Sequence, residues 1–352
     1  ATTATATKRV EDDIVAQIGK NIISIRGNLI RPNLRLLVIH TNSEDEKMIW
    51  LGQNLSKING NGIIYTGTQV NTEVYSKWLE FLKINSIAYN AGLDAESRKT
   101  IEQGLINDRY KCVVSTNALG MGIDKPNIRY IIHTQLPVSP IHYYQEIGRA
   151  GRDGQPSYII LFFNPETDLD LPKSFIENGK PSIDKYQKII NALRQDRLGL
   201  HQLIKRVNLK QPQVNVIKAD LIEQGIINEV LEGKSKKYEL RFNAPQLDTS
   251  KFETLRNAKL KDFEQMQAYI NTEGCRMKFL CDFLGDNMPI KCGVCDNDQN
   301  KKYGVTTSNE WLEKIEQFRS EYFPTLEVEG ARTKLVNGVA ASHYGVSNVG
   351  QA

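Results

Sequence analysis

The sequence lacks the features of a membrane or secreted protein. No apolar run approaches the ~18 residues that a membrane-spanning helix needs, and the first residues carry neither the charged nor the apolar region of a signal peptide. The formal net charge of +4 at pH 7 is a modest bias, compatible with nucleic-acid binding but too small to indicate it. These absences predict a cytoplasmic protein without a membrane partner.

The sequence also lacks a phosphate-binding loop. Residues 233–235 read Gly-Lys-Ser, like the end of such a loop, but Asn228 occupies the position of its first glycine, so the required spacing is not met. Asp45 and Glu46 lie in a polar stretch without the apolar strand that precedes a magnesium-binding acidic pair. The tripeptide is therefore predicted to be a basic turn, and neither pattern predicts a nucleotide site.

What the sequence does contain is the pattern of a multidomain protein. Its 352 residues suffice for two or three cores, and 40% apolar with 24% charged residues is ordinary for globular domains. Between residues 20 and 165, apolar runs alternate with amphipathic stretches such as 73–83 and 95–103. The expected strands are 36–40, 62–65, 87–89, 112–115, 130–133 and 158–163. This alternation predicts an α/β domain with a doubly wound parallel sheet.

A run from Gln145 to Gly154, QEIGRAGRDG, places two arginines three residues apart among glycines. If this segment opens a helix, residues three apart share a face, so that Arg149 and Arg152 can point at the same polyanion. The terminal phosphate of a nucleotide is such a polyanion. The alternative is a surface turn with solvated charges.

Residues 111–126, KCVVSTNALGMGIDKP, end an apolar run in hydroxyl groups and two glycines. This is the pattern of a buried parallel strand that leads into a ligand-binding loop, and residues 128–133 form a second such strand. At these motifs the chain strongly resembles the RecQ family of superfamily 2 DNA helicases, matching the fifth and sixth conserved motifs of that family.

The resemblance extends outward from these motifs. Residues 62–69 look like the fourth motif, and residues 89–93 look like the next signature, with Asn90 where the family usually has histidine. Residues 31–34 resemble the start of the second motor domain, and residues 3–7 resemble the third motif, which ends the first motor domain. We therefore expect the chain to begin where a first RecA-like domain finishes.

The resemblance implies roles for individual residues. Those expected to reach the γ-phosphate of ATP across the cleft between two RecA-like domains are Gln145, Arg149 and Arg152. Gly122 and Asp124 are expected to couple the nucleotide to their loop. Those expected to contact DNA in this domain are Thr66, Thr116 and Asn90. In this class the first domain supplies the phosphate loop, the magnesium-binding carboxylate and the catalytic base, which makes that missing domain an implied partner.

From about residue 191 the composition shifts to two short amphipathic helices and a hairpin. Apolar residues recur at helical spacing at Leu200, Leu203, Ile204 and Val207, and then at Val214, Ile217 and Leu221. Two strands, 226–230 and 238–242, follow on either side of a basic turn. The pattern predicts a winged helix or, alternatively, a simple packing module. The residues expected to contact DNA phosphates or stack at a duplex end are Lys234, Lys236, Lys237 and Tyr238.

The remaining strong pattern is a group of cysteines. Cys275 and Cys292 are separated by sixteen residues, Cys292 and Cys295 by two, and Asp298 stands at the next position in register. This looks like the zinc site of RecQ helicases, which normally have cysteine at the last place; aspartate can ligate zinc through oxygen. Cys281 is the competing fourth ligand, but in a helix it would lie about 120° around and ~9 Å along from Cys275, which favours Asp298. The alternative to a metal site is a group of reduced thiols.

The expected domain order differs from the familiar RecQ arrangement, in which the zinc module follows the motor and precedes the winged helix. Arg152 and Cys275 are 123 positions apart, which leaves room for a winged helix inserted between motor and zinc module. The expected segments are the end of a first RecA-like domain (1–19), a second RecA-like domain (20–190), a winged helix (191–248), a helical zinc-binding module (249–303) and the start of an unidentified domain (304–352). Trp311, Ile315 and Phe318 predict an amphipathic helix in the last segment.

These expectations combine into one function. The full-length protein is predicted to be an ATP-dependent helicase that moves 3′ to 5′ on single-stranded DNA and separates duplexes. Its implied cofactors are ATP, Mg²⁺ and Zn²⁺, its partners are single strands and duplex junctions, and it acts as a monomer, at the nucleoid if bacterial. This portion alone is expected to be inactive. The rival hypothesis is a noncatalytic DNA-binding or strand-annealing module on a helicase-like scaffold.

Overall fold

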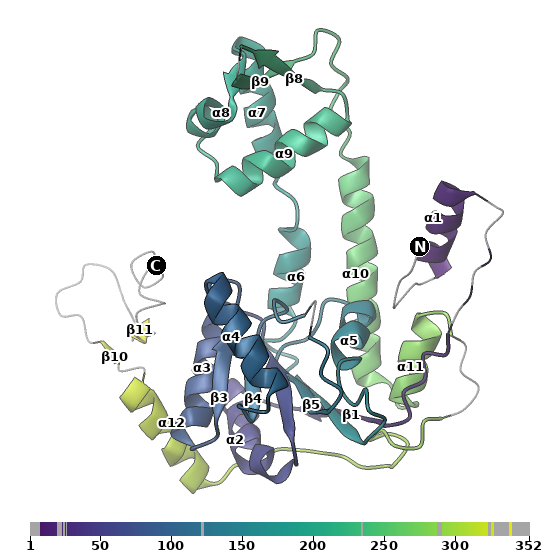
Figure 1. Cartoon of the computed structure of the whole chain (residues 1–352), viewed down its shortest axis with the longest axis vertical. Helices are drawn as coiled ribbons and strands as arrows, with labels where there is room; N and C mark the ends of the chain where they lie inside the picture. Colours follow the sequence, from purple (N-terminus) through teal and green to yellow (C-terminus); the bar gives the residue numbers. More distant parts are fainter. Residues whose placement is uncertain are drawn as a thin grey trace. The chain divides into compact units, whose positions relative to one another are not determined.

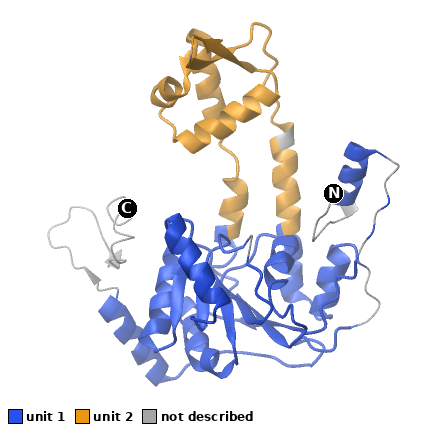
Figure 2. Cartoon of the chain, viewed as in Figure 1, with its two compact units in different colours: residues 1–171, 263–352 blue, residues 172–262 orange. Residues whose placement is uncertain are grey.

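The computed structural model describes residues 8–19, 23, 25, 27–120, 123–233, 235–286 and 291–322, with the strand residues 325–326 and 338–339. The chain divides into two compact units, residues 1–171 with 263–352 and residues 172–262 (Figure 2). The second unit therefore interrupts the first in sequence and precedes the cysteine group, as the predicted domain order requires.

The larger unit is built on a six-stranded sheet in the order β1-β6-β5-β2-β4-β3 (Figure 1). Its strands are β1 (Leu34–His40), β2 (Asn61–Tyr65), β3 (Ser86–Tyr89), β4 (Cys112–Ser115), β5 (Ile128–His133) and β6 (Ser157–Phe163). All neighbouring strands pair in parallel. Each predicted strand lies within an observed one, so the α/β class with a parallel sheet is confirmed.

Hydrogen-bonding side chains fix where the helices of this unit begin. The helices after the first strands are α2 (Glu44–Asn54), α3 (Gln69–Phe81), α4 (Ala95–Ile106) and α5 (Pro140–Ile147). Each is preceded by an N-cap side chain that accepts a hydrogen bond from the third following backbone N–H; these caps are Ser43, Thr68, Asp94 and Ser139. The connections from strand to helix at the carboxyl edge of the sheet are therefore short and defined. A separate helix, α1 (Lys8–Ile18), precedes the sheet, and a short 3₁₀ turn, η1 (Leu55–Lys57), follows α2.

The helix predicted around Trp311 forms as α12 (Asn309–Tyr322), and it packs onto α2 and α3. Phe318 is 1% exposed and its ring lies 5.3 Å from that of Trp78 on α3. A Cβ on Gly52 of α2 would lie 2.7 Å from the Trp311 ring, so only glycine leaves room for this contact. Residues 309–322 therefore complete the core of the sheet unit.

The prediction that residues 304–352 open another domain is wrong for α12. The apolar face of α12 packs against residues that precede it by more than 200 positions. A helical pattern in the sequence shows that the helix has an apolar face, but not which residues that face contacts. Beyond α12 the described residues form only two short antiparallel strands, β10 (Thr325–Leu326) and β11 (Gly338–Val339).

The smaller unit has the topology of a winged helix. Its elements are α7 (Ile183–Gln195), β7 (Leu198–Gly199), α8 (Leu200–Val207), α9 (Gln211–Glu223), β8 (Ile227–Glu232) and β9 (Ser235–Leu240). The strands form an antiparallel sheet in the order β7-β9-β8. One core joins the three helices to the sheet, with Tyr186, Leu203 and Ile217 fully buried.

Two details of this unit differ from the sequence prediction. The compact unit spans 172–262 and not 191–248, because α7 supplies Ile189 and Leu193 to its core. The second hairpin strand starts at Ser235, so Lys236 and Lys237 lie within a strand and not in the turn.

Two helices cross the boundary of the unit in sequence, α6 (Asp170–Glu177) and α10 (Ser250–Asn271), and α11 (Arg276–Phe283) follows. Within the described residues, no helix has the length and apolarity that crossing a membrane requires.

Replacing Phe318 by alanine should lower the free energy of unfolding by about 3–5 kcal/mol, because the change empties a buried aromatic site. Leu312→Ala on the same helix is the matched control, since that side chain is 43% exposed, and it should cost about 0.5 kcal/mol or less. Chemical denaturation of both variants measures the difference. Equal, small losses would show that α12 does not belong to this core.

Candidate functional site

The two arginines lie on a loop and not on a helix. Helix α5 ends at Ile147, and residues 148–154, here called the arginine loop, form successive turns. Gly151 has a φ of +55°, and a Cβ there would lie 2.4 Å from the Asn33 amide nitrogen. Of the two alternatives for this segment, a helix or a turn, the structure has the turn, because the left-handed glycine turns the chain back toward β6.

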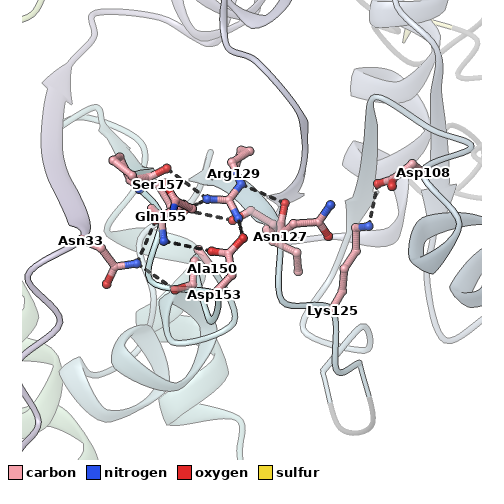
Figure 3. Close-up of polar contacts among 12 residues, drawn as sticks. Asn33, Asp108, Lys125, Asn127, Arg129, Ala150, Asp153, Gln155 and Ser157 are labelled. Carbon is pink, nitrogen blue, oxygen red and sulfur yellow. Dashed lines mark hydrogen bonds and ion pairs between the residues drawn. The ribbon is translucent and has the colours of Figure 1, made fainter.

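Side chains at, or just before, the starts of strands β1 and β5 hold the arginine loop in place. Arg31 donates from Nη2 to the carbonyl oxygens of Ala150 (2.7 Å) and Gly151 (3.0 Å). Asn33 donates to the Gly151 carbonyl at 2.7 Å. Arg129 at the start of β5 forms an ion pair with Asp153 (Figure 3). This hydrogen-bonded pair lowers the pKa of the Asp153 carboxyl.

These three supporting residues were missed as site residues by the sequence analysis. The signal that could have found Arg31 and Asn33 is the match of residues 31–34 to the start of a motor domain. Burial lowers the pKa of Arg31, Tyr144 opposes this shift, and Arg152 adds to it. The positive charges of Arg31 and Arg152 therefore repel one another.

The two arginines of the loop have different surroundings. Arg152 forms an ion pair with Asp124 at 2.6 Å, and the two side chains are 39% and 82% exposed. Arg149 lies against the Gly120 backbone, since a Cβ there would be 3.3 Å from its Nη2. Its Nε is buried and has no hydrogen-bond partner among the described residues. Arg152 can therefore exchange an exposed partner for a phosphate, whereas Arg149 retains an unused donor.

The other predicted nucleotide residues are placed only in part. Gln145 lies on the exposed side of α5. Asp124 faces Arg152, as the preceding contact shows. Gly122 lies outside the described residues.

Every strand of the sheet is followed directly by threonine or asparagine. In sheet order these residues are Thr41, Asn164, Thr134, Thr66, Thr116 and Asn90. The three predicted DNA contacts follow the adjacent strands β2, β4 and β3, so the fold brings them to one edge, as parallel strands require. The carboxyl edge of the sheet is therefore lined with hydrogen-bonding groups.

Only one of these three predicted DNA contacts has a partly exposed side chain. Asn90 is 6% exposed, donates to Thr72 Oγ1 at 3.1 Å and accepts from the Gly92 N–H at 2.9 Å. Thr66 is also 6% exposed and its hydroxyl donates to the Thr68 carbonyl. A direct DNA contact does not fit either side chain, because each holds its own loop. Thr116 is half-buried, and its hydroxyl accepts the Ala118 N–H at 3.4 Å.

A buried ion pair, which the sequence analysis missed, lies at the same carboxyl edge of the sheet. Lys47 lies 2.7 Å from Asp168, with side chains 1% and 3% exposed, and it also donates to the Thr134 carbonyl at 2.8 Å. Burial raises the pKa of Asp168 and Lys47 opposes the shift. This pair connects α2, the end of β5 and the segment that leads to α6.

The smaller unit, residues 172–262, is here called the winged unit. The predicted roles of its hairpin residues also need correction. Tyr238 is 4% exposed and its ring is covered by Lys218, whose Nζ lies 4.5 Å from the ring centroid. It therefore cannot stack on a base, and that prediction is wrong. Lys236 and Lys237 pair with Glu229 and Glu232 across the hairpin. Lys234 lies outside the described residues.

The structure brings the predicted metal ligands together. The donor atoms of Cys275, Cys292, Cys295 and Asp298 all lie within 4.8 Å of one another, and Cys281 is not in this group. An ion bound to sulfur at ~2.3 Å fits such a set of three thiolates and one carboxylate. Burial raises the pKa of Cys281 to about 12, which keeps it a neutral thiol. The donor set therefore suits zinc, and Asp298 is the fourth member.

Residues 275–298, here called the metal-binding segment, are attached to the sheet by the residues that follow two of these candidate ligands. Asp296 donates its N–H to the Leu36 carbonyl at 3.0 Å and accepts from the Val38 N–H at 3.0 Å. Arg276 donates from Nε to the other carboxylate oxygen at 2.5 Å. Both charged side chains are 5% exposed. The free edge of β1 is closed in this way.

Two family models match the chain. The helicase conserved C-terminal domain matches residues 46–154, which include strands β2 to β5 and the arginine loop. The RecQ zinc-binding family matches residues 237–299, from strand β9 through the four metal-binding residues.

Curated relatives match over most of the chain. The ATP-dependent DNA helicase RecQ of Synechocystis is 30% identical over 311 residues, covering 84% of this chain and 62% of the relative. The probable ATP-dependent DNA helicase RecS of Bacillus subtilis is 30% identical over 318 residues, covering 85% and 59%. RecQ of Bacillus subtilis is 35% identical over 196 residues, covering 55% and 32%. The chain thus spans 62% or less of each of these relatives.

Purified protein should contain about one zinc ion per chain by elemental analysis. Asp298→Ala should weaken zinc retention about 10- to 100-fold in competition with a chelator, because it removes one of four donors. Cys281→Ala is the control and should leave retention unchanged. Zinc lost by Cys281→Ala and kept by Asp298→Ala would reverse the assignment of the fourth ligand.

Proposed function

The chain belongs to the RecQ family of helicases, and on that premise we propose that the full-length protein is an ATP-dependent helicase that moves 3′ to 5′ on single-stranded DNA and separates duplexes. The matched relatives carry helicase names, and the two family models match the chain in the order motor, then zinc module. This chain would supply the second RecA-like domain, the winged unit and the metal-binding segment.

The main support for the proposal is that hydrogen bonds and an ion pair hold the arginine loop in one conformation. Arg31, Asn33 and Arg129 hold its backbone in one shape, so Arg149 and Arg152 are presented at fixed positions before a ligand arrives. Fixed cations next to a transferring phosphoryl group stabilise the charge that develops on it without reorganising during the reaction. Arg152 would leave the exposed Asp124 for the γ-phosphate, and Gln145 would support it from α5.

The other half of the nucleotide site is assigned to a different domain of the same protein. The sequence of this chain contains no phosphate-loop spacing. The first RecA-like domain would hold ATP and Mg²⁺ and supply the catalytic base, and Gly122 with Asp124 would couple the nucleotide to the second domain. Closure of the two domains on ATP would shift their grip on the DNA strand.

The charge distribution supports DNA binding by the winged unit. Residues 172–262 contain 18 Lys and Arg against 11 Asp and Glu, a net charge of +7 in a chain whose total is +4. Phosphate contacts of this kind position a strand without reading its sequence. Lys234, Lys236 and Lys237 would contribute on the hairpin, and Thr116 would hold a phosphate at the sheet edge. The proposed partners are single strands and duplex junctions, and the proposed oligomeric state is a monomer that works where DNA is present in the cell.

Zinc has a structural role in this proposal. Three thiolates and a carboxylate leave no open coordination position in a tetrahedral site, so the ion would supply cross-linking and not catalysis. Its ligands flank Arg276 and Asp296, which tie the segment to strand β1.

Arg152→Ala in the full-length protein should lower the rate of DNA-stimulated ATP hydrolysis by about 10³-fold, because an arginine at the γ-phosphate acts on the transition state. DNA affinity should stay within about twofold of wild type. Steady-state hydrolysis and fluorescence anisotropy measure the two quantities.

Arg35→Ala is the matched control, since it removes an exposed arginine from β1 outside the arginine loop. It should leave hydrolysis unchanged. Wild-type turnover in Arg152→Ala would refute the assignment. A full-length protein with no phosphate loop and no ATP hydrolysis would support the noncatalytic DNA-binding alternative.

Lys236→Ala should weaken DNA binding equally for all sequences and reduce the slope of log affinity against log salt by about 1. Glu229→Gln removes the carboxylate that pairs with Lys236 at 2.7 Å, so it should raise affinity. Titrations at several salt concentrations measure both effects. Unchanged slopes in both variants would exclude the hairpin from the DNA-binding surface.

A further inference from the structure

A continuous column of four buried rings crosses the sheet unit. The rings belong to Tyr65 of β2, His133 of β5, Tyr143 of α5 and Tyr269 of α10. Successive ring centroids lie 5.2, 5.1 and 5.2 Å apart. The hydroxyl of Tyr269 also donates to that of Tyr143 at 3.4 Å. No ring is more than 4% exposed, so the column is packed on all sides.

One end of the column touches Arg149. The Tyr65 hydroxyl donates to the Leu119 carbonyl at 2.9 Å, and the Arg149 guanidinium lies against the next residue, Gly120. Arg149 also lies near the Tyr65 phenol and partly opposes the rise in the pKa of Tyr65 that burial causes. Tyr65 therefore lies between the loop at the end of β4 and the arginine.

The middle of the column holds the backbone that carries the same arginine. His133 Nε2 lies 2.7 Å from the Glu146 carboxylate. The Glu146 carbonyl in turn accepts the Arg149 N–H at 3.2 Å. Arg149 is thus restrained twice, at its guanidinium through Tyr65 and at its backbone through His133 and Glu146.

The other end of the column, Tyr269 of α10, packs against Arg276 of the metal-binding segment. The Arg276 guanidinium carbon is 5.5 Å from the Tyr269 ring centroid, and its Nη1 donates to the Tyr269 carbonyl at 3.0 Å. Arg276 follows Cys275, and its partner Asp296 follows Cys295. The column therefore runs from residues adjacent to two metal ligands to the arginine loop.

We propose that Tyr65 and His133 are positioning residues for Arg149, and that the ring column transmits its position from the metal-binding segment. The inference rests on the proposed function, because it concerns ATP turnover. Close-packed rings leave few alternative arrangements, so a shift at Tyr269 moves Tyr143 and His133. Among the described residues the buried Nε of Arg149 has no hydrogen-bond partner, so loss of the column would let its guanidinium leave the reactive position.

Tyr65→Phe in the full-length protein tests the first half of the proposal, because it removes only the hydroxyl. The kcat of DNA-stimulated ATP hydrolysis should fall about tenfold, with KM for ATP and DNA affinity within twofold of wild type. Tyr130→Phe is the matched control: it is fully buried in the same sheet, and its hydroxyl likewise donates to a backbone carbonyl, that of Lys111, at 2.6 Å. The two variants should have similar Tm values, while only Tyr65→Phe loses turnover.

A double-mutant cycle separates positioning from general destabilisation. If Tyr65 acts through Arg149, Tyr65→Phe should lower kcat about tenfold in the wild type and less than twofold in an Arg149→Lys background. Equal losses in both backgrounds would overturn the positioning role. So would equal kcat values for Tyr65→Phe and Tyr130→Phe.

Tyr269→Leu tests the second half, with Phe263→Leu as its control, because both rings are buried on the same helix and only Tyr269 belongs to the column. Only Tyr269→Leu should lower kcat, at an unchanged zinc content. Equal effects of the two variants would overturn the link to the metal-binding segment. Absent ATP hydrolysis in the wild type, or full activity of Arg152→Ala, would instead refute the proposed function itself, and with it this inference.

Discussion

The contact on which the sheet unit depends is the buried ion pair between Asp296 and Arg276 at the edge of strand β1. Asp296 bonds to the β1 backbone at two points, and Arg276 neutralises its charge. Removing one partner of a buried pair leaves an uncompensated charge and costs about 3–5 kcal/mol. An open parallel sheet also needs its edge covered. The metal-binding segment therefore stabilises the sheet unit, and the sheet unit in turn orders the residues of the candidate metal site.

The arginine loop is likewise held by contacts with residues distant in sequence. The loop contains three glycines and would be flexible alone, yet Arg31, Asn33 and Arg129 bind its backbone and its one acidic side chain. All three residues lie at the starts of β1 and β5 or just before them. The position of Arg149 and Arg152 is thus set by residues at, or just before, the starts of two strands. The ring column contacts the arginine loop as well, and its other end packs against Arg276 of the metal-binding segment.

Local features of the fold could be predicted from the sequence. All six strands were found because each is a short apolar run, and parallel strands are buried on both faces. The four residues that the fold brings together as a candidate metal site, Asp298 included, could be picked out because their spacing is itself the signal. Errors arose where packing decided the outcome. Tyr238 reads as an exposed stacking residue but is buried under Lys218, and residues 148–154 could be read as a helix or a surface turn, whereas α5 ends at Ile147 and turns follow.

The sequence by itself determined which chemical groups are present and which short segments carry them: the arginine pair, the strand-end hydroxyls, the basic winged unit and the metal ligands. Only the tertiary structure decided which of these groups are accessible and what holds them. Val38 and Asp296 are 258 positions apart, and Tyr143 and Tyr269 are 126 apart. Contacts over such separations follow from how the elements pack, because side-chain periodicity reports that a face is apolar or polar but not which distant face it meets.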